Sequence, residues 1–442
     1  MNETIVHEQQ GRTARSYQAA LSDWKRWAAD HAYALNTIRP EPWSSTGGAI
    51  AQDKFIDLDM LIPLLADKRI VYLGENSHGV AEFNLVKTRL IQYLHQTLGY
   101  NIVAFESGLG DAALAQGRMK KTTTNETMMH SIFGVWWTEE TKPLFEYMKE
   151  THKSESPLRL ASFDIQVQSS FFQDANWIPS KQLKDRALQA EKEVHKWRMS
   201  KYLNGFRKAK PELIKVYEEL LQAVAKNENA LKRDYLDEPH IVKLMKRALD
   251  DRIRVIQEFN ELCIQSNLLT EQGDYSGAQS MMEWRDRTMA SNLAWLATEI
   301  YPEEKIIVWG HNGHISKAQS LISIMPKSMG ELMPKELQQE SYVMGLFMGE
   351  GQVAENTREP LQLDPMIPGS MEDILSAAGQ PYTFMDLLYR ENERGNSWMF
   401  ERMIASYQVM MPMPIELRRH FDGVLLIKQV KMPTYLPHKV TK

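Results

Sequence analysis

The chain has 442 residues, of which 43% are hydrophobic and 25% are charged, and its formal net charge is −5. This composition is ordinary for a globular protein with a sizeable core, and the charge argues against nucleic acid or an anionic membrane as a partner. A single cysteine, Cys263, excludes an internal disulfide framework and an all-cysteine metal site. The polar N-terminus and the lack of an apolar run of about 20 residues predict a cytoplasmic protein with no membrane partner.

Helical and extended patterns alternate along the chain. Apolar residues at helical spacing predict helices at 16–32, at 57–66 and over about 18 residues after His78, with a loop at 40–48. Short apolar runs predict strands at 69–73, 101–106, 158–164, 306–310, 341–348, 382–387 and 423–430. Strands that alternate with helices indicate an α/β fold with a mainly parallel sheet and flanking helices.

The stretch from about 175 to 275 is almost continuously helical and heavily charged. It is too long for one crossover between parallel strands, so we predict a large inserted helical subdomain that covers one edge of the site. The predicted organisation is therefore an N-terminal helical segment, residues 1–68, packed on an α/β core, residues 69–442, that carries this insertion. No repeat of fixed period is present, which argues against a solenoid.

Titratable residues follow four of the predicted strands. Parallel strands share their carboxyl edge, so side chains at these four ends should meet on one rim of the sheet, where open α/β sheets bind their ligands. Titratable groups gathered in a cleft mark functional sites. The residues concerned are Glu75 with His78, Glu106 with Ser107, Asp164, and His311 with His314.

His78 is the best candidate for a general base, because it precedes an amphipathic helix whose N-terminus favours the neutral imidazole. Glu75 could orient His78 or hold a water molecule. The structural alternatives are a capping histidine and a carboxylate paired with the helix N-terminus. His311 and His314 are three residues apart and could bind a metal or donate to an oxyanion. No His-Glu-x-x-His run supports a metal, so we expect no cofactor, with a divalent ion at these two histidines as the alternative.

The helix before the 306–310 strand carries Glu283, Arg285 and Arg287. Alternate arginines on a helix usually lie on solvated faces, but one that points over the strand ends could clamp a carboxylate or stabilise an oxyanion. The chain has no Gly-x-Ser-x-Gly motif, so Ser77 and Ser107 are poor candidates for a nucleophile elbow.

At these residues the chain resembles the erythromycin esterase family. The similar motifs occur in the family's order and span about residues 50–430. They are Gly74-Glu-Asn-Ser-His-Gly79 with Glu82-Phe83, Ala104-Phe-Glu-Ser107, Phe163-Asp-Ile165, Arg285-Asp-Arg-Thr-Met-Ala290, His311-Asn-Gly-His-Ile315 and Phe421-Asp-Gly423. The resemblance implies that residues 69–442 form a hydrolase-like catalytic core, which opens the lactone ring of macrolide antibiotics with an activated water and without an acyl-enzyme.

The resemblance also implies the roles of individual residues. His78 would be the general base, assisted by Glu75. The other catalytic residues implied are Glu106, Arg285, His311 and His314, and the substrate-binding residues expected are Arg287, Asp164, Lys87 and Glu283. Some relatives that act on macrolides have an arginine where this chain has Lys87, which puts macrolide specificity in question. The alternatives are a hydrolase of another ester, with or without a metal, and a protein that binds a ligand in this cleft without turning it over.

One further segment bears on the substrate. The methionine-rich run Met410-Met-Pro-Met413 and the helical stretch are candidates for an apolar wall and a lid. Methionine adapts to irregular apolar surfaces, as a macrocycle would need, and the alternative is ordinary core filling.

Overall fold

The computed structural model describes residues 14–42, 52–166, 172, 175–322, 325–408 and 411–437. Within these residues the main sheet has the strand order β1-β8-β11-β6-β2-β5-β3-β4, with β7 paired to β6. The run from β11 through β6, β2, β5 and β3 to β4 is parallel throughout. The strands β1, β7 and β8 join it in antiparallel fashion. The mixed α/β class with a mainly parallel sheet is therefore confirmed.

The strands are β1 Tyr33–Ala34, β2 Ile70–Leu73, β3 Tyr100–Gly108, β4 Arg159–Asp164, β5 Lys305–Trp309, β6 Ser341–Ala354, β7 Pro360–Gln362, β8 Tyr382–Asp386, β9 Arg402–Gln408, β10 Met411–Glu416 and β11 Gly423–Val430. The α-helices up to the helical stretch are α2 Ala14–His31, α3 Leu61–Leu64, α4 Ala81–Leu98, α5 Leu109–Gly117, α6 Thr124–Ser131 and α7 Lys142–Thr151. The helical stretch holds α8 Lys181–Arg198, α9 Leu203–Lys226, α10 Glu228–Asp234, α11 Ile241–Arg254, α12 Asn260–Glu271 and α13 Ser276–Trp295. The remaining α-helices are α14 Asn312–Ile315, α15 Met329–Leu332, α16 Lys335–Gln339, α17 Met371–Ser376 and α18 Leu417–His420.

Short helices of other types are also present in the described part of the chain. The 3₁₀-helices are η1 Gln52–Leu58, η2 Gly134–Trp136, η5 Gln319–Leu321 and η6 Ser397–Met399. The π-helical turns are η3 Val255–Phe259 and η4 Leu296–Ile300, and they extend α11 and α13.

All seven predicted strands are present. The helix predicted after His78 is α4, which has 18 residues. The region predicted as one helix at 57–66 is instead the end of η1 followed by the short helix α3. Most of the loop predicted at 40–48 lies outside the described residues, as does Met410.

The strand pair β9 and β10 was not predicted from the sequence. It forms a separate two-stranded antiparallel sheet. Pro412 and Pro414 alternate along β10, and proline lacks the N–H that a strand donates. Such a strand is tolerated at an edge, where only one side is paired, but its sequence does not look like that of a strand. The described part of the methionine-rich run, 411–413, thus belongs to an edge strand, in which Met411 is exposed.

The two faces of the sheet belong to separate hydrophobic cores. Ile70 and Tyr72 of β2 pack into one core, and Val71 and Leu73 pack into the other. Side chains of α13 belong to the first core and side chains of α4 and α7 belong to the second. Strands buried on both faces have continuous apolar runs, which is why their positions could be predicted from the sequence.

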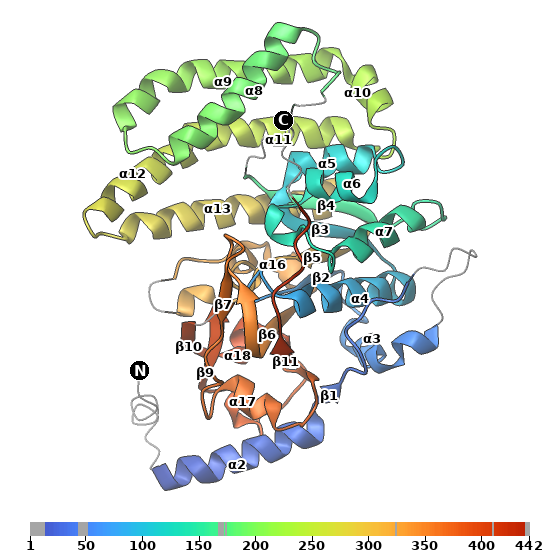
Figure 1. Ribbon diagram of the computed structural model, residues 1–442, viewed down its shortest axis with the longest axis vertical. Helices are drawn as coiled ribbons and strands as arrows, with labels where there is room; N and C mark the ends of the chain where they lie inside the picture. Colours follow the sequence, from blue (N-terminus) through green and yellow to red (C-terminus); the bar gives the residue numbers. More distant parts are fainter. Residues whose placement is uncertain are drawn as a thin grey trace.

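The helices α8 to α12 follow β4 in the chain and lie together at one end of the molecule, while α2 lies at the opposite end (Figure 1). Helix α2 buries Leu21, Trp24 and Trp27, as its spacing predicted, and it contacts α17. The division at residue 68 and the status of about 175–275 as an inserted subdomain stay predictions. In the described part of the chain, no helix is both long and apolar enough to cross a membrane.

Candidate active site

Parallel pairing brings titratable side chains to one edge of the sheet. The strands β4, β3, β5 and β2 are neighbours in that order, so their carboxyl ends lie side by side. We call the residues that meet there the strand-end cluster: Glu75, His78, Lys87, Glu106, Asp164, Arg285, Asp286, His311 and His314. The cluster has one group around Glu75 and another around Arg285, and the ring of His311 lies near the histidines of both groups.

Glu75 is the centre of the first group, and its side chain is fully buried. His78 Nδ1 lies 2.6 Å from Oε1, and Trp136 Nε1 donates to the same oxygen over 2.9 Å. Lys87 Nζ donates to Oε2 over 2.6 Å. These contacts fix both oxygens, so the carboxylate can hold the His78 ring in one orientation.

The charges around Glu75 decide which nitrogen of His78 carries a proton. Burial alone would raise the pKa of Glu75, but the Lys87 ammonium and His78 hold that pKa below its ordinary value. An ionised carboxylate only accepts hydrogen bonds, so His78 Nδ1 must be the donor, and in the neutral ring Nε2 keeps its lone pair. Burial lowers the pKa of Lys87 to about 8, although Glu75 acts in the opposite direction. In this arrangement His78 has the tautomer that a general base requires.

Arg285, on α13, is the centre of the second group. Its Nε and Nη2 donate to the two oxygens of Asp164 over 3.2 and 2.6 Å, and Nη2 also donates to Glu106 Oε1 over 2.8 Å. Nη1 lies 3.0 Å from Nε2 of His314, whose Nδ1 lies 2.8 Å from Asp286 Oδ1. The guanidinium therefore joins the ends of β3 and β4 to the turn after β5.

Burial and charge act against each other in this group, and charge prevails. Burial would raise the pKa of Glu106, but His314 and Arg285 hold it well below its usual range. Burial would lower the pKa of His314, but the carboxylates of Asp286 and Glu106 raise it above its ordinary value. Burial opposes the charge on Arg285 as well, yet Asp164 and Glu106 raise its pKa. Glu106 and Arg285 thus keep their charges despite burial, and the pKa of His314 is shifted toward its charged form.

Among the described residues, His311 differs from the other two histidines because no carboxylate accepts a hydrogen bond from its ring. Its backbone N–H donates to Glu106 Oε2 over 2.9 Å, and its Nδ1 accepts from the backbone N–H of Gly313 over 3.0 Å. Burial, reinforced by His78, lowers the pKa of His311 to about 3. The ring is therefore neutral near pH 7, with its hydrogen on Nε2.

Two glycines let the first turn of the site approach its neighbours. A Cβ on Gly74 would lie 2.0 Å from Oδ1 of Asn312, and a Cβ on Gly79 would lie 1.9 Å from the carbonyl oxygen of Ala354. Asn312 in turn donates its backbone N–H to the carbonyl oxygen of Glu75 over 2.7 Å. A side chain at Gly74 would push the turn that holds Glu75 away from the turn that holds His311, and one at Gly79 would push it away from the end of β6.

The structure separates some residues that the sequence grouped together. Lys87 is fully buried behind Glu75, and Asp164 is buried against Arg285, so in this conformation each supports another residue of the site. Arg287 is exposed and forms an ion pair of 2.6 Å with Glu283. In the part of the chain that the structure describes, neither of these two makes a hydrogen bond to the strand-end cluster. Substrate contact by these residues stays a prediction.

Two residues of the site were missed in the sequence. Asp286 lies between the two arginines that were considered, and its position next to Arg285 was a usable signal. Trp136 comes from η2, about 60 residues from Glu75 in sequence, and nothing in the local pattern indicates its role. Arg89 points away from the site and pairs with Asp57.

Protein groups engage most of the ring nitrogens of His311 and His314, the pair considered for a metal ion. Both ring nitrogens of His314 face protein groups, and one of them faces the Arg285 guanidinium at 3.0 Å. Nδ1 of His311 already accepts a backbone N–H. Over the described ranges, no three His, Cys, Asp or Glu side chains are grouped as metal ligands. In this conformation both ring nitrogens of His314 and Nδ1 of His311 are thus engaged by protein groups, and the expected lack of a metal stays a prediction.

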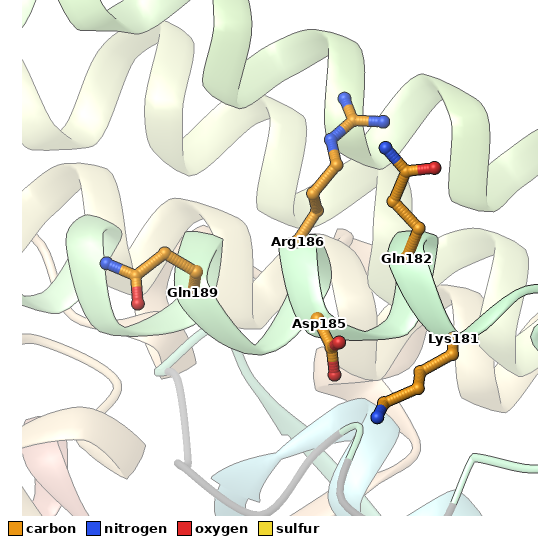
Figure 2. A pocket seen from close by; sticks show the side chains of 5 residues that line it. All are labelled: Lys181, Gln182, Asp185, Arg186 and Gln189. Atoms are coloured by element: carbon orange, nitrogen blue, oxygen red, sulfur yellow. The ribbon is translucent and has the colours of Figure 1, made fainter.

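A hollow of about 590 Å³ lies elsewhere, on the surface of α8. Its lining comes from this one helix, and Figure 2 shows Arg186 and Gln182 pointing to one side of α8 while Lys181 and Asp185 point to the other. Arg186 is engaged by Glu219 at 2.7 Å. These side chains diverge and include no residue of the strand-end cluster, so the hollow provides no second set of convergent groups.

The fold and the cluster define an α/β protein with acid–histidine pairs at the carboxyl edge of a parallel sheet. Comparison with known proteins identifies the family. A family model described as Erythromycin esterase matches residues 95–430. The chain belongs to the erythromycin esterase family, which indicates a hydrolase. The resemblance seen in the motifs is thereby confirmed.

Relatives and solved structures agree with this assignment. YbfO of Bacillus subtilis strain 168, provisionally named a hydrolase, is 32% identical over 92% of this chain and 91% of its own length. The erythromycin esterase type II of Escherichia coli is 23% identical over 85% of this chain and 93% of its own. A Bacillus cereus crystal structure shares the fold with a TM-score of 0.69 at 20% identity, covering 94% of this chain and 99% of its own. A solved structure of a mutant of the erythromycin esterase EreC, in its open conformation, has a TM-score of 0.60 at 17% identity. The match covers 86% of this chain and 95% of that chain.

Proposed function

We propose that this protein is a carboxylic ester hydrolase in which His78 activates a water molecule for direct attack on the ester carbonyl. The observation that carries the proposal is the pairing of His78 Nδ1 with the buried Glu75 carboxylate at 2.6 Å. With Nδ1 engaged, Nε2 is the nitrogen that can take a proton from water. The side chain of His78 is 18% exposed, whereas that of Glu75 is 0% exposed, so the base is open to solvent and its partner is not.

His311 is the proposed donor to the developing oxyanion. Its ring centroid lies 5.2 Å from that of His78, so the two side chains can act on one ester group. Nδ1 accepts from the Gly313 N–H, so the ring hydrogen is on Nε2. The lowered pKa of His311 keeps the ring neutral. A preorganised donor of this kind is worth about 10²–10³-fold in rate.

A route through water, without an acyl-enzyme, is supported by the surroundings of the two serines. Ser107 Oγ accepts the backbone N–H of Phe133, and Ser77 Oγ accepts that of Gly79. Among the residues described, neither serine has a hydrogen bond to His78. An activated serine would need that contact with its base.

Macrolide lactones are the proposed substrates, and their hydrolysis would confer macrolide resistance. The support is the family itself and the coverage of the Escherichia coli erythromycin esterase type II, of which 93% aligns with this chain. Lys87 is buried against Glu75, so its difference from an arginine acts on the carboxylate rather than on a bound macrocycle.

The test is mass spectrometry of a macrolide panel after incubation with purified protein. We expect addition of one water to at least one macrolide, with a loss of about 10²–10⁴-fold in His78→Ala and no acyl adduct on the quenched enzyme. If every macrolide stays unchanged, the proposed substrate class is wrong. If the protein also binds the macrolides tightly, it acts as a binding protein and not as an enzyme. Activity of His78→Ala within a few-fold of the parent would refute the base.

A separate measurement addresses the metal-dependent alternative. We expect the purified hydrolase to contain no stoichiometric divalent metal and to keep its activity after dialysis against a chelator. Stoichiometric zinc or manganese, with activity lost to the chelator and restored by the metal, would replace the mechanism given above.

A further inference from the structure

The three histidines of the strand-end cluster are all held through Nδ1. His78 is held by Glu75 at 2.6 Å, His314 by Asp286 at 2.8 Å, and His311 by a backbone N–H. The side chains of both carboxylates are 0% exposed. The cluster therefore contains two acid–histidine pairs, and the proposed function uses only the first of them as a base.

Ester hydrolysis needs a proton donor as well as a base. When the carbon–oxygen bond to the alcohol breaks, its electron pair moves to the alkyl oxygen, and an alkoxide is a poor leaving group unless it is protonated as it departs. A group positioned to give that proton contributes about 10²–10⁴-fold in rate. His78 has taken a proton from water on the attacking side, so a separate donor on the leaving side would make both transfers direct.

His314 has a partner for each of its protonation states. In the neutral ring, Nε2 can accept from Arg285 Nη1 at 3.0 Å. In the protonated ring, Nε2 can donate to Glu106 Oε1 at 3.3 Å, a long contact that a substrate oxygen can displace because Arg285 already occupies that carboxylate oxygen at 2.8 Å. A residue that gives up and regains a proton in each cycle needs such a pair of contacts.

Asp286 is itself fixed in position. Its Oδ1 accepts the backbone N–H of Met329 over 2.7 Å as well as facing Nδ1 of His314. This contact ties α13 to α15 and holds the carboxylate where it keeps the ring hydrogen of Nδ1 in place. The side chain of His314 is 15% exposed, so part of the ring is open to solvent.

We propose that His314 is the general acid that protonates the alkyl oxygen of the leaving alcohol, and that Asp286 is the positioning residue that holds it. The inference rests on the proposed function. Water attacks the carbonyl carbon as His78 Nε2 takes its proton, the tetrahedral intermediate collapses, and His314 Nε2–H gives a proton to the departing oxygen. His78 then releases its proton, and neutral His314 regains one from solvent, so the sum is ester plus water to acid plus alcohol.

The surrounding groups act on the pKa of His314 in both directions. Burial and the Arg285 guanidinium lower its pKa, whereas Asp286 on α13 and Glu106 on β3 raise it above the ordinary value. His311, the remaining titratable group that faces it, is neutral near pH 7.

Two esters with the same acid part test the inference: ethyl butyrate, whose alkoxide needs a proton, and p-nitrophenyl butyrate, whose phenolate leaves without one. We expect Asp286→Asn and His314→Gln to lower kcat/KM for the ethyl ester by about 10²-fold. For the p-nitrophenyl ester, kcat/KM should stay within about threefold of the parent value. Asp286→Asn should also move the alkaline limb of the pH profile for the ethyl ester to lower pH. His78→Ala should lower both activities, and the exposed Asp364→Asn should change neither.

Equal losses on the two esters, or no loss on either, would overturn the role of His314 while leaving His78 as the base. If Asp286→Asn fails to fold, His314→Gln decides the question by the same comparison. Failure of the wild-type protein on both butyrates would count against the inference. If the macrolides also stay unchanged, the proposed function fails with it.

Discussion

The strand-end cluster and a second buried cluster both combine buried acids with an arginine, but the pKa values of their glutamates shift in opposite directions. The second, which we call the helical-layer cluster, consists of Asp111, Glu191, Tyr217 and Arg252. Glu191 accepts from Tyr217 over 2.7 Å and from Arg252 Nε over 3.2 Å. Burial raises the pKa of Glu191 and of Asp111, and the single guanidinium of Arg252 does not reverse either shift.

The difference lies in the number of cations and donors that each carboxylate meets. In the strand-end cluster, Glu75 and Glu106 meet Lys87, Arg285 and histidines, and their pKa values are lowered despite full burial. In the helical-layer cluster, two acids share one arginine. Burial alone therefore does not mark a reactive carboxylate, and what matters for chemistry is whether the acid stays ionised and can hold a histidine in one tautomer.

The largest expected effect follows from removing a cation of the strand-end cluster. Lys87→Met would leave Glu75 buried without its ionic partner, and breaking a buried ion pair in this way costs about 3–5 kcal/mol. The measurement is urea unfolding of both proteins, with the exposed Lys208→Met as the matched control. A loss below about 1 kcal/mol would mean that the Lys87–Glu75 pair does not stabilise the fold.

The buried side chain of Glu238, outside both clusters, shows how burial of an acid should make stability depend on pH. Glu238 has no ion pair within the described ranges, and burial raises its pKa to about 7. Because the folded protein holds this proton more tightly than the unfolded chain, the contribution to stability is complete below about pH 4.5 and is lost as the pH rises through 7. The loss is about 3 kcal/mol, and Glu238→Gln should remove it from unfolding curves measured between pH 4.5 and 8. An unchanged pH dependence in the variant would show that Glu238 is ionised in the folded protein.

A matched pair of substitutions contrasts the two clusters directly. Asp111→Asn should change the free energy of unfolding at pH 7 by less than about 1 kcal/mol, because asparagine resembles the protonated acid that burial favours there. Asp164→Asn should cost about 3 kcal/mol or more, because it leaves Arg285 with one carboxylate fewer. Equal losses would show that both clusters hold ionised acids, against the contrast drawn above.

The smallest expected effect concerns the two arginines of α13. Arg287→Ala should alter stability by about 0–1 kcal/mol, because exposed ion pairs contribute little, and we expect kcat/KM to stay within about twofold. Arg285→Ala serves as the reference and should impair both. A large rise in KM for Arg287→Ala would instead support the substrate contact predicted from the sequence.

Much of the fold could be predicted because buried parallel strands have continuous apolar runs, as β2 and β3 do. The edge strands β7 and β10 could not, since β7 is largely exposed and β10 is only partly buried and contains two prolines. In the site, the strand-end acids and histidines could be named because parallel strands share one carboxyl edge. Trp136 could not, because its contact with the site depends on how η2 packs, and for Asp286 the only signal was its position next to Arg285.

The sequence by itself determined which strands carry titratable ends, and therefore that Glu75, Glu106, Asp164 and the histidines would meet. Only the tertiary structure decided that Lys87 lies behind Glu75 and that Asp286, rather than Arg287, faces the site. It also decided the ionisation of each acid. The physical reason is that a pKa depends on burial and on the nearest charges, and both are set by contacts between residues that are far apart in the chain.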